Sequence, residues 1–137
     1  MQRTIIIDDE PEYRAWFRSQ LEGSEEFHVV GEAGTGEEAY RMAAKYRPDL
    51  VIVDLYLGDT DGLEICHVIK QCYPDTNVIL TSAQSGRAYD RLAEEKGALA
   101  FIPKKYLSLN SLLRFFRNRL IPVSAPSPEI SGRGTKL

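Results

Sequence analysis

Acidic, hydroxyl and amine side chains stand at the ends of short apolar runs in this chain of 137 residues. Asp8 and Asp9 follow one run, Asp54 follows another, and Thr81–Ser82 and Lys104 follow two more. Each has an ordinary explanation on its own, since an Asp after a strand often caps a helix and a Lys there is often solvated. Their recurrence after successive apolar runs indicates one shared site.

Three carboxylates around one point imply a metal ion. Like charges a few ångströms apart raise each other's pKa, so a stable fold needs a cation between them. Carboxylate oxygens and water are the ligands that Mg²⁺ prefers, and they suit Mn²⁺ as well. A nearby ammonium group can neutralise an anion, and an Asp carboxylate can accept a phosphoryl group. Metal, carboxylate, hydroxyl and ammonium together are typical of phosphoryl transfer.

Alternating apolar and amphipathic stretches would bring these side chains together. Continuous runs such as Thr4–Ile7 are typical of strands buried on both faces, and apolar residues at helical spacing separate them. The expected strands are residues 4–7, 28–33, 50–53, 77–81 and 98–102. The expected helices begin at Pro11, cover 39–46, 63–73 and 87–96, and follow a cap at Ser108. Gly97 is the expected stop of the fourth helix.

Such alternation predicts an α/β fold in which helices cover both faces of a parallel sheet. For a chain of this size we expect the flavodoxin-like (βα)5 doubly wound parallel sheet, with strand order 2-1-3-4-5. Ligands of this fold bind beyond the carboxyl ends of strands 1 and 3. The chemistry should therefore lie just after Ile7 and just after Val53.

Length and composition set further limits. We expect one domain, residues 1–121, and a flexible linker or tail over residues 122–137, which are rich in Pro and Ser. The formal net charge of -3 argues against a dedicated nucleic-acid binder. No apolar run is long enough for a membrane span, and no signal peptide precedes Asp8. Cys66 and Cys72 form no CxxC motif, and as two half-buried thiols on one helix they favour a cytoplasmic protein.

Four sequence blocks resemble the receiver domain of two-component response regulators. Ile5–Asp9 resembles the family's first strand and acidic pair, and Pro48–Asp54 resembles the strand that carries the phosphoacceptor. Asp61–Glu64 resembles the start of the third helix, and Gly97–Lys104 resembles the last strand. The blocks occur in the family's order and at its spacing, over about residues 3–120.

The resemblance implies a role for each site residue. Asp54 would accept the phosphoryl group, and Lys104 would pair with it. Asp9 and Asp54 would ligate Mg²⁺ (or Mn²⁺) directly, and Asp8 would act mainly through water. The main-chain carbonyl of Tyr56 would complete the protein ligands.

The resemblance also implies a switch. Counting back from Lys104 by the family's interval reaches Ser82, which would be the hydroxyl that moves toward the phosphate. Thr81 is the alternative if the register slips by one residue. Phe101 would be the aromatic residue whose rotamer follows this movement.

The sequence departs from the family pattern in the loops around the site. Gly58 stands where Pro is common, so residues 57–60 are expected to be more mobile, and Lys105 stands where Pro often follows the key Lys. Tyr56 and Gln84 occupy positions that govern access of water in the family. We expect the bulky Tyr56 to slow loss of the phosphoryl group.

The resemblance implies a signalling phosphoacceptor that catalyses its own phosphorylation and autodephosphorylation, not a metabolic enzyme. The donor would be a sensor histidine kinase or a phosphotransfer protein. Val29–Ala33 and Gly36–Ala39 resemble the subfamily in which the receiver precedes a helix-turn-helix domain that regulates transcription. This chain itself is expected to bind neither nucleic acid nor a membrane. The last strand and the two helices beside it would carry the output, and a homodimer could form through that face.

Two alternatives remain open from the sequence. One is a receiver-like interaction module that is never phosphorylated, although Asp8, Asp9, Asp54, Ser82 and Lys104 are all present. The other is a flavodoxin-like cofactor binder, which would need a Ser/Thr/Gly-rich loop after the first strand, where this chain has Asp-Asp-Glu-Pro.

Overall fold

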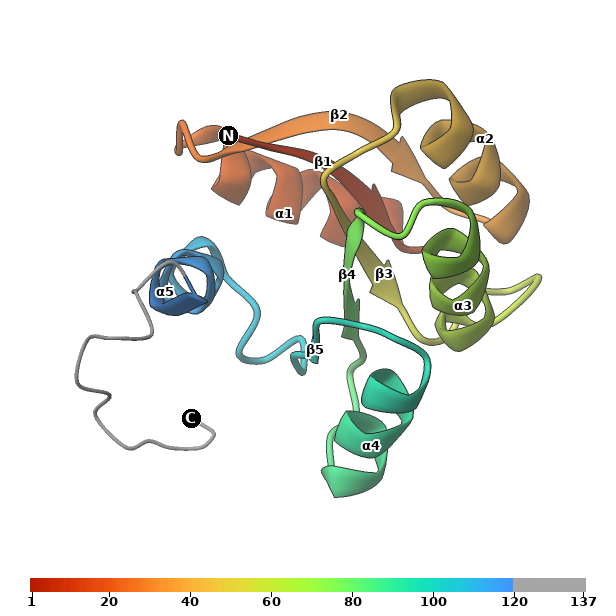
Figure 1. The fold of residues 1–137 in the computed structure, drawn as a ribbon. Helices are drawn as coiled ribbons and strands as arrows, with labels where there is room; N and C mark the ends of the chain where they lie inside the picture. The colour runs from red at the N-terminus through yellow and green to blue at the C-terminus, as the bar shows by residue number, and fades with distance from the viewer. Residues whose placement is uncertain (120–137) are drawn as a thin grey trace.

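Five parallel strands form one sheet in the order β2-β1-β3-β4-β5, as predicted (Figure 1). The structure is a computed structural model that describes residues 1–119, with side chains to residue 117. The strands are β1 (Gln2–Ile7), β2 (Phe27–Ala33), β3 (Leu50–Asp54), β4 (Asn77–Thr81) and β5 (Ala100–Phe101). The flavodoxin-like (βα)5 topology is thereby confirmed.

Helices cover both faces of the sheet (Figure 1). They are α1 (Pro11–Glu22), α2 (Gly36–Tyr46), α3 (Gly62–Cys72), α4 (Arg87–Glu95) and α5 (Leu109–Arg119). Ile5 and Ile7 lie in the core beneath α2 and α3, and Ile6 lies in the core beneath α1 and α5. Because side chains alternate along a strand, a sheet covered on both faces requires a continuous apolar run, as in β1.

Local signals set the helix boundaries. Ser108 caps α5 as predicted, with its Oγ accepting a hydrogen bond from the Ser111 N–H at 3.1 Å. Gly97 ends α4 with φ +87°, a conformation that glycine adopts at little cost. The α2 helix begins at Gly36, earlier than predicted, because the Thr35 side chain accepts a hydrogen bond from the Glu38 N–H and caps it.

Two expectations about the elements were wrong. The last strand covers only Ala100–Phe101, although the Leu99 and Ile102 N–H groups still donate hydrogen bonds to carbonyls of β4. The two thiols are not both half-buried, since Cys66 is buried and Cys72 is exposed. Six residues advance a helix by about one and two-thirds turns, which puts the two cysteines on different faces.

Two other expectations concern the chain's extent. The domain end at residue 121 and the tail over residues 122–137 lie outside the described residues. In residues 1–119, no helix has both the length and the apolar character that a membrane span requires.

Candidate functional site

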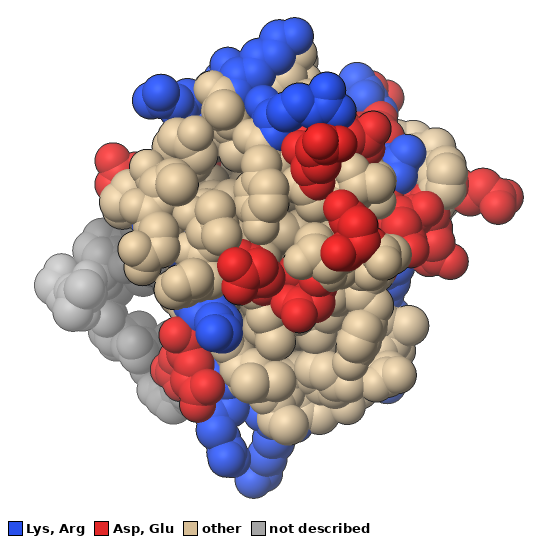
Figure 2. Space-filling view, turned by 90° about the vertical axis from the view of Figure 1, so that its right-hand side faces the viewer, with Lys and Arg blue, Asp and Glu red and all other residues tan. Residues whose placement is uncertain are grey.

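Parallel pairing of β1 and β3 brings the predicted carboxylates together. Ile7 is paired with Val53, so Asp8 and Asp54 leave the sheet side by side at its carboxyl edge. One oxygen from each of Asp8, Asp9 and Asp54 lies within 4.8 Å of the others. Asp8 and Asp54 are buried and Asp9 is exposed. Figure 2 views the molecule from the right-hand side of Figure 1, the side at which β1 and β3 end. Asp and Glu side chains gather on this face.

Lys104 bridges two of these carboxylates. Its Nζ lies 2.8 Å from Asp8 Oδ2 and 3.0 Å from Asp54 Oδ2, and the side chain is only 13% exposed. The Lys104 N–H donates to the Ser82 carbonyl at 2.9 Å, which holds this segment beside the end of β4. Burial opposes the charge on Lys104, but its hydrogen bonds with Asp8 and Asp54 raise its pKa above the ordinary value. The ammonium group therefore stays charged.

The donor atoms fit a divalent cation. Asp8 Oδ2 is buried, and among the described residues the Lys104 ammonium, at 2.8 Å, is its one partner. Asp8 Oδ1 accepts from the Glu10 N–H and Asp54 Oδ1 from the Tyr56 N–H, which orients both carboxylates. Among the described residues, none donates a hydrogen bond to the Tyr56 carbonyl. Three carboxylates and a free carbonyl offer the hard oxygen ligands that Mg²⁺ or Mn²⁺ takes.

Asp8 provides a pH-dependent test of this electrostatic arrangement. Burial raises the pKa of Asp8, opposed by its hydrogen bonds from Lys104 and the Glu10 N–H, while the charge of Asp54 adds to the rise. The folded state then binds the proton more tightly than the unfolded state. The charge on Asp8 therefore costs stability once the pH rises above the ordinary Asp range near pH ~4.

Asp8→Asn is accordingly expected to raise the free energy of unfolding at pH 7 when divalent cations are absent. The gain should shrink toward zero as the pH falls below ~4, where Asp8 is protonated in both states. Urea unfolding at several pH values measures it. A gain that is as large at pH 3 as at pH 7 would contradict the electrostatic origin.

Hydrogen bonding distinguishes the two hydroxyls at the end of β4. Thr81 Oγ1 donates a hydrogen bond to the Ile102 carbonyl at 2.6 Å, so this hydroxyl connects the end of β4 to the residue after β5. Ser82 is buried, and its Oγ accepts from the Gln84 N–H at 3.1 Å. Ser82 thus has the more available proton, which favours it over Thr81 as the switch hydroxyl.

The sequence did not point to two residues that contact Lys104. The Tyr13 ring lies under the ammonium group, with Nζ 4.3 Å from the ring centroid, and Glu10 Oε1 lies 3.3 Å from Nζ. Tyr13 also belongs to the apolar face of α1, where its ring stacks on the Phe17 ring with centroids 6.0 Å apart. A helical apolar pattern identifies the buried side of the helix but does not reveal that the face of the Tyr13 ring meets a cation.

We expect the Tyr13 ring, not its hydroxyl, to hold Lys104 in place. Tyr13→Phe keeps the ring and should leave the phosphorylation that the sequence predicts, with acetyl phosphate as donor, unchanged, because among the described residues the Tyr13 hydroxyl has no hydrogen-bond partner. Tyr13→Leu removes a cation–π contact worth about 1–2 kcal/mol and should slow phosphorylation several-fold. Rates from intact mass spectrometry compare the two variants. Equal rates for Phe and Leu would show that the ring contributes nothing.

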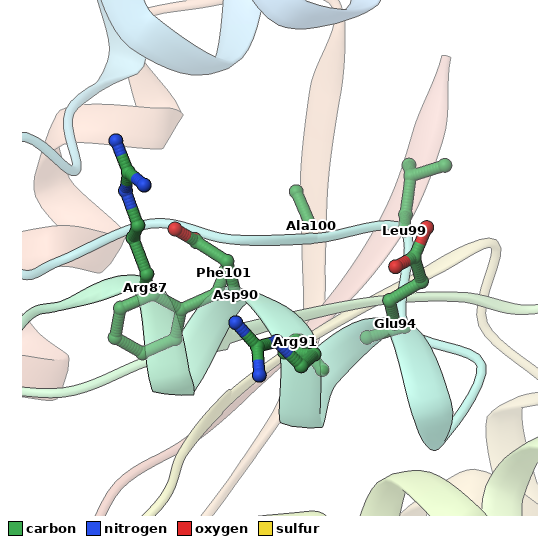
Figure 3. Close-up of a pocket in the computed structure, with 9 residues that line it drawn as sticks. Arg87, Asp90, Arg91, Glu94, Leu99, Ala100 and Phe101 are labelled. Atoms are coloured by element: carbon green, nitrogen blue, oxygen red, sulfur yellow. The ribbon is translucent and has the colours of Figure 1, made fainter. Parts of the chain in front are cut away.

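Phe101 lies on β5 beside a charged pocket. Its ring stacks on the Tyr89 ring of α4, with centroids 5.3 Å apart and planes at 17°. Figure 3 shows α4 side chains on one side of the pocket and β5 with the residue before it on the other. The lining residues include Arg87, Asp90, Arg91 and Glu94 of α4, together with Leu99, Ala100 and Phe101. A rotation of Phe101 would therefore change this surface.

Glycine and aspartate fix the loop between β3 and α3. A Cβ on Gly62 would stand 2.3 Å from the Asp54 carbonyl oxygen, so only glycine lets α3 begin this close to the end of β3. Both Asp59 carboxylate oxygens accept from the Gly36 N–H at 3.0 Å, which ties the loop to the start of α2. The greater mobility expected from Gly58 stays a prediction.

Comparison with known proteins agrees with this geometry. The family described as "Response regulator receiver domain" matches residues 4–115. A Bacillus subtilis "Uncharacterized transcriptional regulatory protein YhcZ" is 34% identical over 99 residues, covering 72% of this chain and 46% of that protein. A Pyrococcus abyssi "Protein-glutamate methylesterase/protein-glutamine glutaminase" is 35% identical over 137 residues, covering 98% of this chain and 37% of that protein. The chain thus spans less than half the length of either relative.

A solved structure shows the same fold. A two-component response regulator of the LuxR family from Aurantimonas sp. SI85-9A1 superimposes with a TM-score of 0.79 at 29% identity. The match covers 93% of this chain and 91% of that structure.

Proposed function

The chain belongs to the response regulator receiver domain family, and on that premise we propose that it accepts a phosphoryl group from a phosphohistidine onto Asp54. The donor would be a sensor histidine kinase or a phosphotransfer protein. The observation that carries the proposal is the bridging of Asp8 and Asp54 by the Lys104 ammonium, beside the exposed Asp9.

Each residue has a part in the transfer. An Asp54 oxygen attacks phosphorus in line, the P–N bond breaks, and the imidazole leaves with the electron pair. Asp9, Asp54 and the Tyr56 carbonyl would hold Mg²⁺ or Mn²⁺, with Asp8 acting mainly through water. The cation would neutralise the charge that develops on the phosphoryl oxygens. Lys104, 3.0 Å from Asp54 Oδ2, is within reach of the same oxygens.

We further propose that phosphorylation is read on the surface of α4, β5 and α5. Ser82 would move toward the new phosphate, and Phe101 would follow, altering the adjoining pocket (Figure 3). This face could bind a second copy of the chain. The transcriptional relative and the block Val29–Ala33 support a helix-turn-helix output, which would place the protein in the cytoplasm.

Intact mass spectrometry after incubation with acetyl phosphate tests this function. The expected result is one added phosphoryl group in the presence of Mg²⁺ and none when EDTA removes the cation. No adduct with acetyl phosphate or with phosphorylated donor proteins would reject the proposal in favour of an unphosphorylated interaction module.

A further inference from the structure

A group of three side chains joins the two loops that flank Asp54 and Ser82. Tyr89 OH donates to Gln84 Oε1 at 2.5 Å and lies 3.2 Å from Tyr56 OH. Because the single Tyr89 hydroxyl proton goes to Gln84, Tyr56 is the donor of the second bond. Tyr89 therefore links the β3–α3 loop to the β4–α4 loop. We call Tyr56, Gln84 and Tyr89 the tyrosine bridge.

Both ends of the tyrosine bridge are attached to the site itself. The Tyr56 N–H donates to Asp54 Oδ1 at 3.1 Å, and the Gln84 N–H donates to Ser82 Oγ at 3.1 Å. Each of these residues lies two positions beyond the side chain that it binds. The tyrosine bridge therefore connects the Asp54 carboxylate to the buried Ser82 hydroxyl.

The half-buried Tyr89 is also held by a contact with the sheet. Its ring stacks on Phe101, so one residue contacts the aromatic residue of β5 and both loops. Tyr56, in contrast, has a side chain that is 55% exposed and has no ring partner among the described residues. Among the described residues, the hydroxyl bond to Tyr89 is the one hydrogen bond of the Tyr56 side chain.

We infer that Tyr89 is a positioning residue that holds Tyr56 beside Asp54, and that this restraint prolongs the life of the aspartyl phosphate. The inference rests on the proposed function of Asp54. In the hydrolysis, a water oxygen bonds to phosphorus, the bond between phosphorus and the Asp54 oxygen breaks, and its electron pair returns to the carboxylate. The water proton goes to solvent, and inorganic phosphate leaves. A Tyr56 ring held in one place restricts the paths by which that water can reach the phosphorus atom.

Single hydroxyl deletions test the inference. The protein is phosphorylated with acetyl phosphate and Mg²⁺, freed of donor by desalting, and followed by intact mass spectrometry. Tyr89→Phe keeps the stack on Phe101 and removes only the hydroxyl link. It should speed decay of the adduct between about two- and tenfold, the range expected for one hydrogen bond. Tyr56→Phe should have the same effect, because it breaks the same bond.

The double variant Tyr56→Phe/Tyr89→Phe tells whether the two hydroxyls act through their mutual hydrogen bond or each loosen the loops independently. If the two hydroxyls act only through their mutual bond, the double variant decays no faster than either single variant. The thermal midpoints of the single variants should stay within a few degrees of wild type, because the bond is exposed. Tyr106→Phe removes a hydroxyl from a tyrosine of similar exposure, 63%, and should leave the decay unchanged.

Three outcomes would overturn the inference. Tyr89→Phe could decay at the wild-type rate, or the effects of the two single variants could multiply in the double variant. Either result leaves phosphorylation of Asp54 intact and rejects the positioning role alone. The absence of any adduct in wild type would reject the proposed function and this inference with it.

Discussion

Asp54→Asn is expected to lower the phosphorylated fraction after incubation with acetyl phosphate and Mg²⁺ by at least on the order of 10²-fold. An amide is not a nucleophile toward phosphorus under these conditions, so the acceptor is lost. The fold should persist, because the Asn side-chain oxygen can still accept the Tyr56 N–H bond and Lys104 keeps its ion pair with Asp8. Intact mass spectrometry measures the adduct, and circular dichroism checks the fold.

Asp61→Asn is the matched control for that substitution. Asp61 lies in the loop that follows Asp54 and caps α3 by accepting from the Glu64 N–H at 2.8 Å. Asn caps a helix as well as Asp does, so this variant should keep both its fold and its adduct. Wild-type phosphorylation of Asp54→Asn would assign the acceptor to another residue.

Lys104→Ala is expected to lower the free energy of unfolding at neutral pH by about 3 kcal/mol when divalent cations are absent. The loss leaves the buried Asp8 and Asp54 carboxylates facing each other without a cation. The raised pKa of Lys104 means that its contribution is fully present below its unfolded value near pH ~10, and so at pH 7. Toward acid pH the deficit should shrink, because Asp8 takes up a proton.

Two further results follow for Lys104→Ala. Added Mg²⁺ should restore part of the lost stability by replacing the missing positive charge, whereas phosphorylation should stay slower by roughly 10²-fold. Lys105→Ala is the control, since Lys105 is exposed, has no ion pair among the described residues and has its Nζ 5.2 Å from the Tyr106 ring centroid, so it should change stability by less than about 0.5 kcal/mol. Urea unfolding of both variants, with and without Mg²⁺, measures these effects. Equal stability of the two variants would contradict the account.

The sequence predicts the meeting of Asp8 and Asp54 because parallel strands end at one edge of their sheet. Once the strand order places β1 beside β3, the pairing of Ile7 with Val53 brings the next residues together. Lys104 follows from the same rule applied to β5. A one-residue shift in a strand reverses the side-chain direction, so the sequence left Ser82 and Thr81 open. Thr81 donates its hydroxyl proton to the Ile102 carbonyl, which supports our proposal that Ser82 is the switch hydroxyl.

Contacts that depend on tertiary geometry were not predictable. Tyr89 belongs to a mostly polar helix, and its hydroxyl partners come from two loops whose paths no local pattern specifies. Tyr13 fits the apolar face of α1, which conceals its place under Lys104. The start of α2 was missed because glycine disfavours helices, whereas the Thr35 cap determines where this one begins.

Chemical trapping of the acyl phosphate tests the central claim most directly. Sodium borohydride reduces an aspartyl phosphate to homoserine, which marks the acceptor permanently. Wild-type protein is phosphorylated with acetyl phosphate and Mg²⁺, reduced, digested and analysed by peptide mass spectrometry. We predict homoserine at position 54 alone, and none when the donor is omitted. Homoserine at position 8 or 9, or an adduct that yields no homoserine, would contradict the assignment of Asp54 as the phosphoacceptor.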